Sequence, residues 1–362
     1  MPLNHLSVRR RVKLQLSSDI PETVIMNKIF TLILLLIITG SAVSVGQSKV
    51  ATSAAPFLAM PIGARAIGMG SANVAISADA LSAYYNPGAI SMLGYSQALA
   101  SHTWWLVGTK FDWVGVVINL DGANAVSVNF TQLDYGEDIV TTDYQQNGTG
   151  EKWAASDLAI ALSYARNLTD RFAIGGSAKY IQQKIWNSSA SAFGVDVGLL
   201  YNTGFNGLKI GMSISNFGSD MRMDGKDLFQ AIDLDPANLG DNNKLITRMK
   251  TDDWPLPLLF RAGVSMDAMK TDELRLTVAA DALRPSDNGE SINVGGELGY
   301  KEMLFLRAGK RQLFLDNPME EYSFGGGIRY ELSGVNALSV DFSYQQFKIF
   351  GGIQSIDVGL TF

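Results

Sequence analysis

Apolar and polar residues alternate with a period of two through most of this chain. The last segment is the clearest, because Ile356, Val358 and Leu360 alternate with polar residues or glycine. The segment before it repeats the pattern with Leu338 and Val340 on its apolar face. Since successive side chains of a β-strand point to opposite faces, this pattern predicts strands that each carry one apolar face.

The same alternation defines fourteen segments, each close to the roughly 9–11 residues that a tilted membrane-spanning strand needs. They are residues 96–105, 110–120, 124–134, 155–168, 171–186, 190–204, 208–218, 257–269, 274–283, 290–300, 303–313, 322–332, 337–347 and 352–362.

The connections between these segments are short at alternate positions. The short ones are Asp121-Gly122-Ala123, Thr169-Asp170, Phe205-Asn206-Gly207, Lys301-Glu302 and Ser333–Asn336. The long ones include residues 135–154 and 219–256. Short periplasmic turns and long outer loops are typical of outer-membrane barrels. We therefore predict an all-β protein, a transmembrane antiparallel up-and-down β-barrel of about 14 strands with both ends of the chain on the periplasmic side.

A soluble β-sandwich is the main structural alternative. Its strands also alternate, with the apolar face turned inward. It offers no reason for loop lengths to alternate, so we favour the barrel. The composition agrees, because 47% of residues are hydrophobic, 10% are aromatic and 36 are glycine, which suits many strands with tight turns and aromatic belts.

One long apolar run, residues 29–45, lies near the N-terminus. It follows Met26-Asn27-Lys28 and ends in small residues, as a secretory signal peptide does. A membrane anchor is the alternative, but the most apolar part, residues 29–38, is shorter than the roughly 20 residues a spanning helix needs. Whether Met1 or Met26 is the true start stays open. We predict export to the cell outer membrane and three regions, with a leader and signal peptide at 1–46, a plug at 47–95 and the barrel at 96–362.

The stretch between the predicted signal and the first strand, residues 63–90, reads GARAIGMGSANVAISADALSAYYNPGAI. Its glycine and alanine content would allow close approach to a barrel wall. We predict a short N-terminal luminal plug. Arg65 and Asp79 are its only charged residues, and we expect each to pair with a wall residue of opposite charge.

Charged residues also fall on the face predicted to point into the lumen. They are Lys179, Asp196, Arg261, Arg275, Asp281, Glu297, Arg307, Arg311, Arg329, Asp341 and Asp357. We favour a mutually compensating charge ladder over a specific substrate site. The candidate plug and lumen residues are Arg65, Asp79, Tyr85, Asn86, Pro87, Arg261, Arg307 and Arg329.

Residues suited to catalysis are scarce. The chain has no cysteine and two histidines, His5 and His102. His102 adjoins Ser101, but neighbouring strand residues face opposite ways, so a Ser-His site is a weak hypothesis. We expect no enzyme, no cofactor and no metal. The net charge of −6 argues against nucleic acid as a partner, since phosphate binding needs a basic face. The acidic loop at residues 219–256 is interpreted as a solvated surface rather than a Ca²⁺ site, because its spacing fits no EF-hand.

The stretch at residues 63–90 resembles the N-terminal signature of the PorV/PorQ family, within the wider FadL-like group of outer-membrane barrels. The matching motifs are Gly63-Ala64-Arg65, Gly68-Met69-Gly70, Val74-Ala75, Asp79-Ala80, Tyr85-Asn86-Pro87 and, after the long loop, Leu256-Pro257-Leu258 with Arg261-Ala262-Gly263. The chain departs from the family in reading Asn86-Pro87-Gly88-Ala89 where Asn-Pro-Ala-Gly is usual, and in lacking a second acidic residue after Asp79.

The resemblance implies a barrel of about fourteen strands whose N-terminal segment folds into the lumen. It also implies two functions. PorV-like proteins are accessories of type IX secretion, which bind exported protein cargo and secretion-machinery subunits. FadL-like proteins are passive channels for long-chain fatty acids or other hydrophobic molecules. A structural barrel with no transport role is the third possibility, and we favour the secretion accessory.

Overall fold

The computed structural model describes residues 52–233, 237, 245–333 and 336–362. The predicted leader and signal peptide at 1–46 lie outside the described residues. Among the described residues, no helix is both long enough and apolar enough to cross a membrane.

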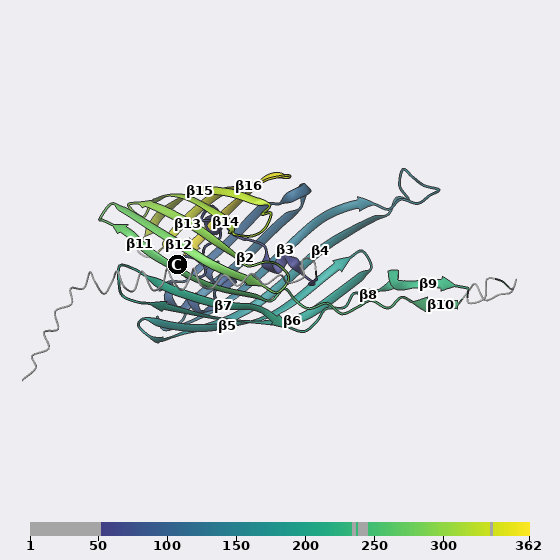
Figure 1. The fold of residues 1–362 in the computed structure, drawn as a ribbon, viewed down its shortest axis with the longest axis horizontal. Coiled ribbons are helices and arrows are strands. Elements are labelled where there is room, and N and C mark those ends of the chain that lie inside the picture. Colours follow the sequence, from purple (N-terminus) through teal and green to yellow (C-terminus); the bar gives the residue numbers. More distant parts are fainter. Residues whose placement is uncertain (1–51, 234–236, 238–244, 334–335) are drawn as a thin grey trace, which may run out of the picture. The chain divides into compact units, whose positions relative to one another are not determined.

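Fourteen antiparallel strands close into one barrel (Figure 1). They are β1 (Gln97–Trp104), β2 (Lys110–Asn119), β3 (Asn124–Ile139), β4 (Lys152–Thr169), β5 (Phe172–Ile185), β6 (Ser188–Asn202), β7 (Lys209–Gly218), β11 (Leu259–Lys270), β12 (Leu274–Pro285), β13 (Ser291–Tyr300), β14 (Leu304–Leu313), β15 (Glu320–Ser333), β16 (Asn336–Phe347) and β17 (Gly351–Thr361). Each pairs with its neighbours in sequence, β7 pairs with β11 across the long loop, and β1 pairs with β17. The predicted fold class is confirmed.

Two strands run further than the alternation predicted. Past a bulge between Asp134 and Glu137, β3 continues to Ile139 and stays paired with the start of β4 at Lys152. Residues 135–139 of this extension are all exposed, and Gly136, Glu137 and Asp138 interrupt the alternation, so the period-two signal that located the strand ends before the pairing does.

The long loop between β7 and β11 also contains structure that the sequence did not predict. It holds β8 (Asp224–Gly225), η4 (Lys226–Leu228), β9 (Phe229–Ile232) and β10 (Leu245–Arg248). β8 pairs with the outer end of β6, whereas β9 and β10 pair with each other as a separate two-stranded sheet. In Figure 1 this hairpin projects beyond the barrel strands. Strands this short carry too little alternation to be recognised.

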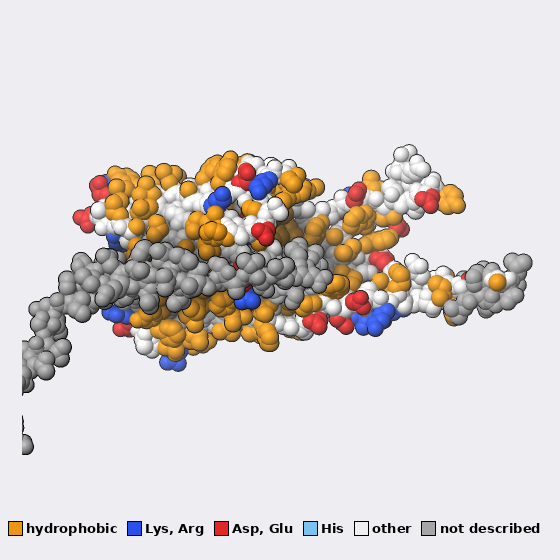
Figure 2. Space-filling model, in the orientation of Figure 1, with side chains coloured by type: hydrophobic (Ala, Val, Ile, Leu, Met, Phe, Trp, Pro, Cys, Tyr) orange, Lys and Arg blue, Asp and Glu red, His pale blue; other side chains and the backbone are white. Residues whose placement is uncertain are grey.

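Large apolar side chains cover the outside of the barrel, whereas the inside holds polar and small side chains and one apolar patch against the plug. In β4, for example, Ile160 and Leu162 are exposed while Ala161 and Ser163 are buried. Figure 2 shows hydrophobic side chains spread over the barrel strands, with charged ones mostly towards the ends. Lipid can solvate such an exterior but water cannot, so this is the arrangement of a membrane barrel rather than a sandwich.

The two barrel ends differ as predicted. Ser96 and Phe362 exchange two backbone hydrogen bonds, of 2.9 and 3.3 Å, so the start and the end of the barrel meet at one rim. The short turns lie at this rim. In the first of them, Asp121 accepts hydrogen bonds from the backbone of Ala123 and Asn124, and Gly122 adopts a φ of 79°. We call this rim the turn end, and the opposite one, which carries the β3–β4 and β7–β11 loops, the loop end.

Candidate functional site

The segment before β1 folds inside the barrel, and we call residues 55–93 the plug. It contains η1 (Pro56–Ala59), α2 (Ala64–Gly68), α3 (Ser82–Tyr85) and η2 (Pro87–Met92). Glycines bound the short helix α2. Gly63 and Gly70, with φ of 88° and 63°, allow the chain to turn into and out of α2. Nearly all plug residues are buried.

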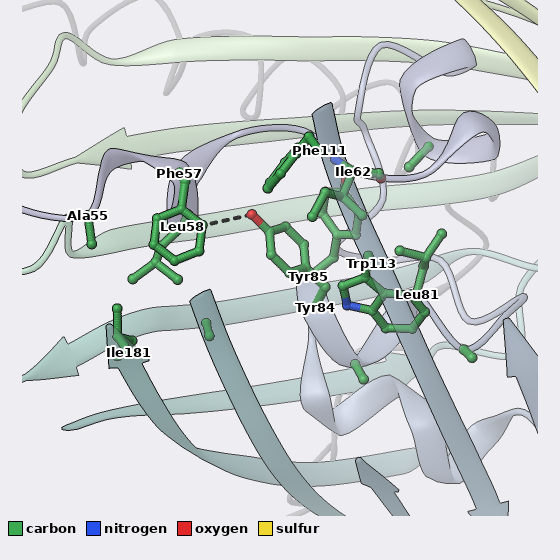
Figure 3. Packing of buried hydrophobic residues seen from close by; sticks show 14 of the residues in the cluster. Ala55, Phe57, Leu58, Ile62, Leu81, Tyr84, Tyr85, Phe111, Trp113 and Ile181 are labelled. Atoms are coloured by element: carbon green, nitrogen blue, oxygen red, sulfur yellow. Dashed lines mark hydrogen bonds between the residues drawn. The ribbon is translucent and has the colours of Figure 1, made fainter. Parts of the chain in front are cut away.

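One half of the plug builds an apolar core with the wall. Figure 3 shows Phe57, Leu58 and Tyr84 of the plug beside Trp113 of β2 and Ile181 of β5. The Tyr84 hydroxyl lies 3.0 Å from the Leu58 carbonyl and 2.7 Å from that of Met60. The aromatic rings therefore pack in the interior while their polar atoms remain hydrogen-bonded, as buried tyrosines require.

Elsewhere the plug backbone lies directly against wall glycines. A Cβ atom added at Gly295 of β13 would lie 2.0 Å from the Met69 carbonyl oxygen, and one at Gly211 of β7 would lie 2.2 Å from that of Val74. Real Cβ atoms do not approach so closely, so only glycine fits at these wall positions.

Contacts of these kinds link the plug to every strand of the barrel. η2 packs on β3, β4, β5 and β6, and α2 packs on β14, β15, β16 and β17. Hydrogen bonds join the plug to β1, β7, β11, β12 and β13, and the apolar core joins it to β2. The plug thus meets the wall around its whole circumference.

A network of charges joins α2 to the wall strands β12, β13, β14 and β16. Arg65 donates to Glu297 from Nε at 2.9 Å and from Nη2 at 3.2 Å. Glu297 also accepts from Arg307 at 2.7 Å and from Arg275 at 3.2 Å, and Arg307 reaches Asp341 at 2.5 Å. With Asp79, and with Glu302, which lies 2.6 Å from Arg275, the network holds three guanidinium groups and four carboxylates, so its formal charge is −1.

The pairing of Asp79 differs from the prediction. Arg65 pairs with a wall carboxylate, but Asp79 pairs with Arg65 itself, at 3.6 Å, and not with a wall cation. Arg307, a wall cation of the same network, forms ion pairs with Glu297 and Asp341 instead. Burial raises the pKa of Asp79, and the charge of Arg65 opposes that shift.

Asn86 connects two parts of the plug with the wall. Its Nδ2 donates to the carbonyl oxygens of Val74, at 2.8 Å, and Leu199 of β6, at 2.9 Å. Its Oδ1 accepts from Gly88 at 3.1 Å, which caps η2, and Pro87 occupies the first position of that helix. The Asn-Pro motif therefore has a structural role at this point in the chain.

The other candidate residues lie at separate places. Arg261 stacks over the Tyr85 ring, with 5.6 Å from the guanidinium carbon to the ring centroid, and donates to Ser215 at 3.3 Å. Arg329 stacks in the same way on Tyr95, just past the plug, at 5.6 Å. The structure thus brings Arg65, Asp79 and Arg307 into one network and leaves the other candidates outside it.

Two wall carboxylates hold the plug backbone and were not among the candidates. Asp281 of β12 accepts from the backbone N–H groups of Asn73, at 2.7 Å, and Val74, at 2.9 Å. Asp357 of β17 accepts from the N–H of Arg65 at 3.3 Å. The predicted inward face contained both residues. However, only the folded plug shows that their partners are backbone groups rather than the cations of a charge ladder.

Other inward charges do pair across neighbouring strands. Lys179 contacts Asp196 at 2.6 Å, and Arg311 contacts Glu320 at 2.6 Å. Ser101 is buried on the inward face, whereas His102 faces outward and lies 2.5 Å from Asp112. Ser101 and His102 therefore do not form a common site. In the described part of the chain, no group of three His, Cys, Asp or Glu side chains is placed to hold a metal ion.

The loop end exposes apolar side chains on the β9–β10 hairpin and the β3–β4 loop. Ile246 is 71% exposed and Phe229 is 54% exposed on the hairpin, and Tyr144 is 99% exposed on the β3–β4 loop. Both edges of the two-stranded sheet are free of further strands within the described residues. Exposed apolar groups beside open strand edges are typical of surfaces that bind another protein chain.

Comparison with known proteins places the chain among outer-membrane barrels. A family model described as type IX secretion system protein PorV matches residues 43–241. Among solved structures, a FadL homologue of Pseudomonas aeruginosa is similar at 13% identity with a TM-score of 0.51, over 84% of this chain and 98% of that one. The toluene transporter TbuX of Ralstonia pickettii is similar at 12% identity and 0.50, over 83% and 97%. TodX of Pseudomonas putida, also a toluene transporter, is similar at 11% identity and 0.50, over 82% and 96%. At these identities the likeness shows the fold. No curated protein sequence matches the chain.

Proposed function

The chain belongs to the family of the type IX secretion system protein PorV, and from this premise we propose that it is an accessory of type IX secretion in the outer membrane. In this role it binds exported protein cargo, or partner subunits of the secretion machinery, at its loop end. It acts without catalysing a reaction.

The observation that carries this proposal is the contact of the plug with all fourteen strands. A passive channel needs a continuous path, whereas here the plug backbone touches wall glycines and its charges are paired with wall charges. Passage through the lumen would require many of these contacts to break together. A barrel that stays filled can still present surfaces at its rim, and such a role uses the exposed loops.

The β9–β10 hairpin is the surface best suited to a protein partner. A two-stranded sheet is marginally stable on its own, and an added strand would satisfy the backbone groups along its free edge. The exposed side chains of Phe229 and Ile246 would then become buried against the partner.

The experiment is a gene deletion in the native host with complementation. The deletion strain should accumulate signal-bearing cargo in the periplasm, and the wild-type gene should restore surface display. The double variant Phe229→Ser/Ile246→Ser should assemble as a barrel, shown by its mobility shift on unheated gels, yet fail to restore display.

The matched control is Phe314→Ser, which removes an 84% exposed aromatic side chain from the β14–β15 loop. It should restore display fully. Normal cargo display in the deletion strain would refute the secretion role. Full activity of the double variant would leave the secretion role standing but show that the β9–β10 hairpin is not its binding surface.

A FadL-like passive channel for long-chain fatty acids or other hydrophobic molecules is the alternative, motivated by the fold that this chain shares with the FadL homologue and the toluene transporters. If this is the main function, deletion should abolish uptake of a labelled long-chain fatty acid and leave cargo display intact. We expect the opposite pair of results.

A further inference from the structure

A cavity of about 460 Å³ lies at the loop end, between the start of the plug and the wall strands β11 to β15. Its apolar lining includes Pro56 and Met60 of the plug, Trp105 after β1, Leu283 of β12 and Leu315 after β14. This volume lies within the roughly 300–1,000 Å³ of sites that bind small molecules, and a mainly apolar lining with a few polar groups is typical of them.

The charges in the cavity wall are unfavourable for an anion. Arg311 is the one cation among the described lining residues, and its Nη1 already donates to both oxygens of Glu320, at 2.8 and 2.6 Å. Gln345 donates to the same carboxylate at 2.6 Å. Asp287 adds a second carboxylate, which accepts from the Ser53 hydroxyl. An anionic group in this space would face two carboxylates with no unpaired cation to offset them.

Hydrogen-bonding capacity nevertheless remains in the same wall. Arg311 Nε, Asn293 Nδ2 and Gln312 Oε1 are covered by neighbouring atoms and have no hydrogen-bond partner among the described residues, so a ligand in the cavity reaches them only after these side chains rotate. Asn293 is 1% exposed and Arg311 is 8% exposed. These atoms are two donors and one acceptor, and buried polar groups without a partner are uncommon in native proteins.

The backbone ladder between β14 and β15 ends beside this group. β14 pairs with β15 from Leu304↔Ile328 to Gly309↔Ser323, so residues 310–313 extend beyond this pairing, although Lys310 and Leu313 stay paired with β13. Gln312 has a φ of 56°, outside strand geometry. Between β14 and β15, side chains rather than backbone pairs therefore close the wall at the cavity, and these side chains can adjust to a ligand without disrupting the barrel.

We propose that this cavity binds a neutral amphipathic molecule whose head group is a primary amide and whose body is apolar. A primary amide both donates and accepts hydrogen bonds, which matches the two donors and one acceptor in the wall. It carries no charge and so meets no repulsion from Glu320 or Asp287. A fatty acid anion of the same length has only acceptors and is repelled by both carboxylates. The proposal is independent of the secretion role.

The test compares octanamide with octanoate at pH 7.5, by titration calorimetry of the full chain in phosphatidylcholine nanodiscs, with empty nanodiscs subtracted. We expect one saturable site for octanamide and at least tenfold weaker binding of octanoate. Ala59→Trp should fill the cavity and abolish octanamide binding. Gln312→Met should weaken it about three- to tenfold, the loss of one hydrogen bond.

The control is Tyr144→Trp, which also introduces a tryptophan but at a 99% exposed loop position outside the cavity. This variant should bind octanamide like the wild type. Every variant is checked for the barrel's mobility shift on unheated gels, and Leu283→Trp replaces Ala59→Trp if the latter does not assemble. Absence of a saturable octanamide site would overturn the proposal. It would also be overturned by octanoate binding within tenfold of the amide, or by unchanged affinity in the cavity-filling variant.

Discussion

The ion pairs of Arg65 should control how often the plug opens. Arg65→Met removes two hydrogen bonds to Glu297 and the ion pair to Asp79. Breaking a buried pair costs roughly 3–5 kcal/mol. We take about 3 kcal/mol, near the lower limit, because Glu297 keeps Arg275 and Arg307 as partners. Asp79 keeps no ion-pair partner among the described residues.

Because the chain contains no cysteine, a single introduced thiol can report this opening. Ala66→Cys places the thiol on α2, where the native side chain is 2% exposed. If labelling by a maleimide occurs only from the open state, its rate follows the opening equilibrium. A change of about 3 kcal/mol then predicts labelling roughly 100-fold faster in Arg65→Met than in the Ala66→Cys parent.

A double variant distinguishes loss of the ion pair from loss of side-chain packing. Arg65→Met/Asp79→Asn removes the charge that the single variant leaves unpaired, so it should label about tenfold more slowly than Arg65→Met. The barrel's mobility shift on unheated gels should be the same in all of these proteins. Labelling of Arg65→Met within threefold of the parent would show that the network does not hold the plug closed.

Three further predictions concern single positions. Gly295→Val should prevent normal seating of the plug and so speed labelling of the same thiol, because a Cβ atom at this position would lie 2.0 Å from a plug carbonyl oxygen. The control is Gly296→Ala, where the added Cβ atom would lie 3.7 Å from its nearest neighbour, and it should label like the parent. Asn86→Ala should lower the apparent melting temperature, because the buried carbonyl group of Val74 and the partly buried one of Leu199 both lose this donor, at about 1–3 kcal/mol for a buried group left unpaired; an unchanged melting temperature would refute its role. Glu302, in the turn after β13, accepts from Arg275 at 2.6 Å, and this hydrogen bond lowers its pKa below the ordinary 4.5. Its stabilisation should therefore be present above about pH 4.5 and be lost as the pH falls further, so the melting temperatures of wild type and Glu302→Gln should converge in acid; a constant difference from pH 7 to pH 3 would contradict this.

The paired network and the apolar core do different work in the plug. The core around Tyr84 and Trp113 excludes water and holds the plug in place without directional demands. The network at Arg65 and the carboxylate of Asp281 fix its orientation, because each needs a partner at hydrogen-bond distance. A partner or ligand that moves the plug must compete with both.

The amino-acid sequence by itself determined the barrel. The fourteen strands, their inward and outward faces and the alternation of short and long connections all follow from a local period of two, since each side chain's face depends only on its own strand. The inward positions of Glu297, Arg307 and Asp281 were predictable for the same reason. The Gly- and Ala-rich stretch around Arg65 also indicated a segment that approaches another backbone closely.

Only the tertiary structure decided which of these inward groups meet. That Asp79 pairs with Arg65 of the plug, that Asp281 binds backbone N–H groups, and that Arg311 and Asn293 lie in the wall of one cavity depends on how the plug seats among strands far apart in the sequence. The β9–β10 hairpin likewise depends on the pairing of two strands that are too short to show an alternation in the sequence. Contacts across a lumen join residues with no fixed spacing along the chain, so periodicity located the wall and the fold alone determined what the wall holds.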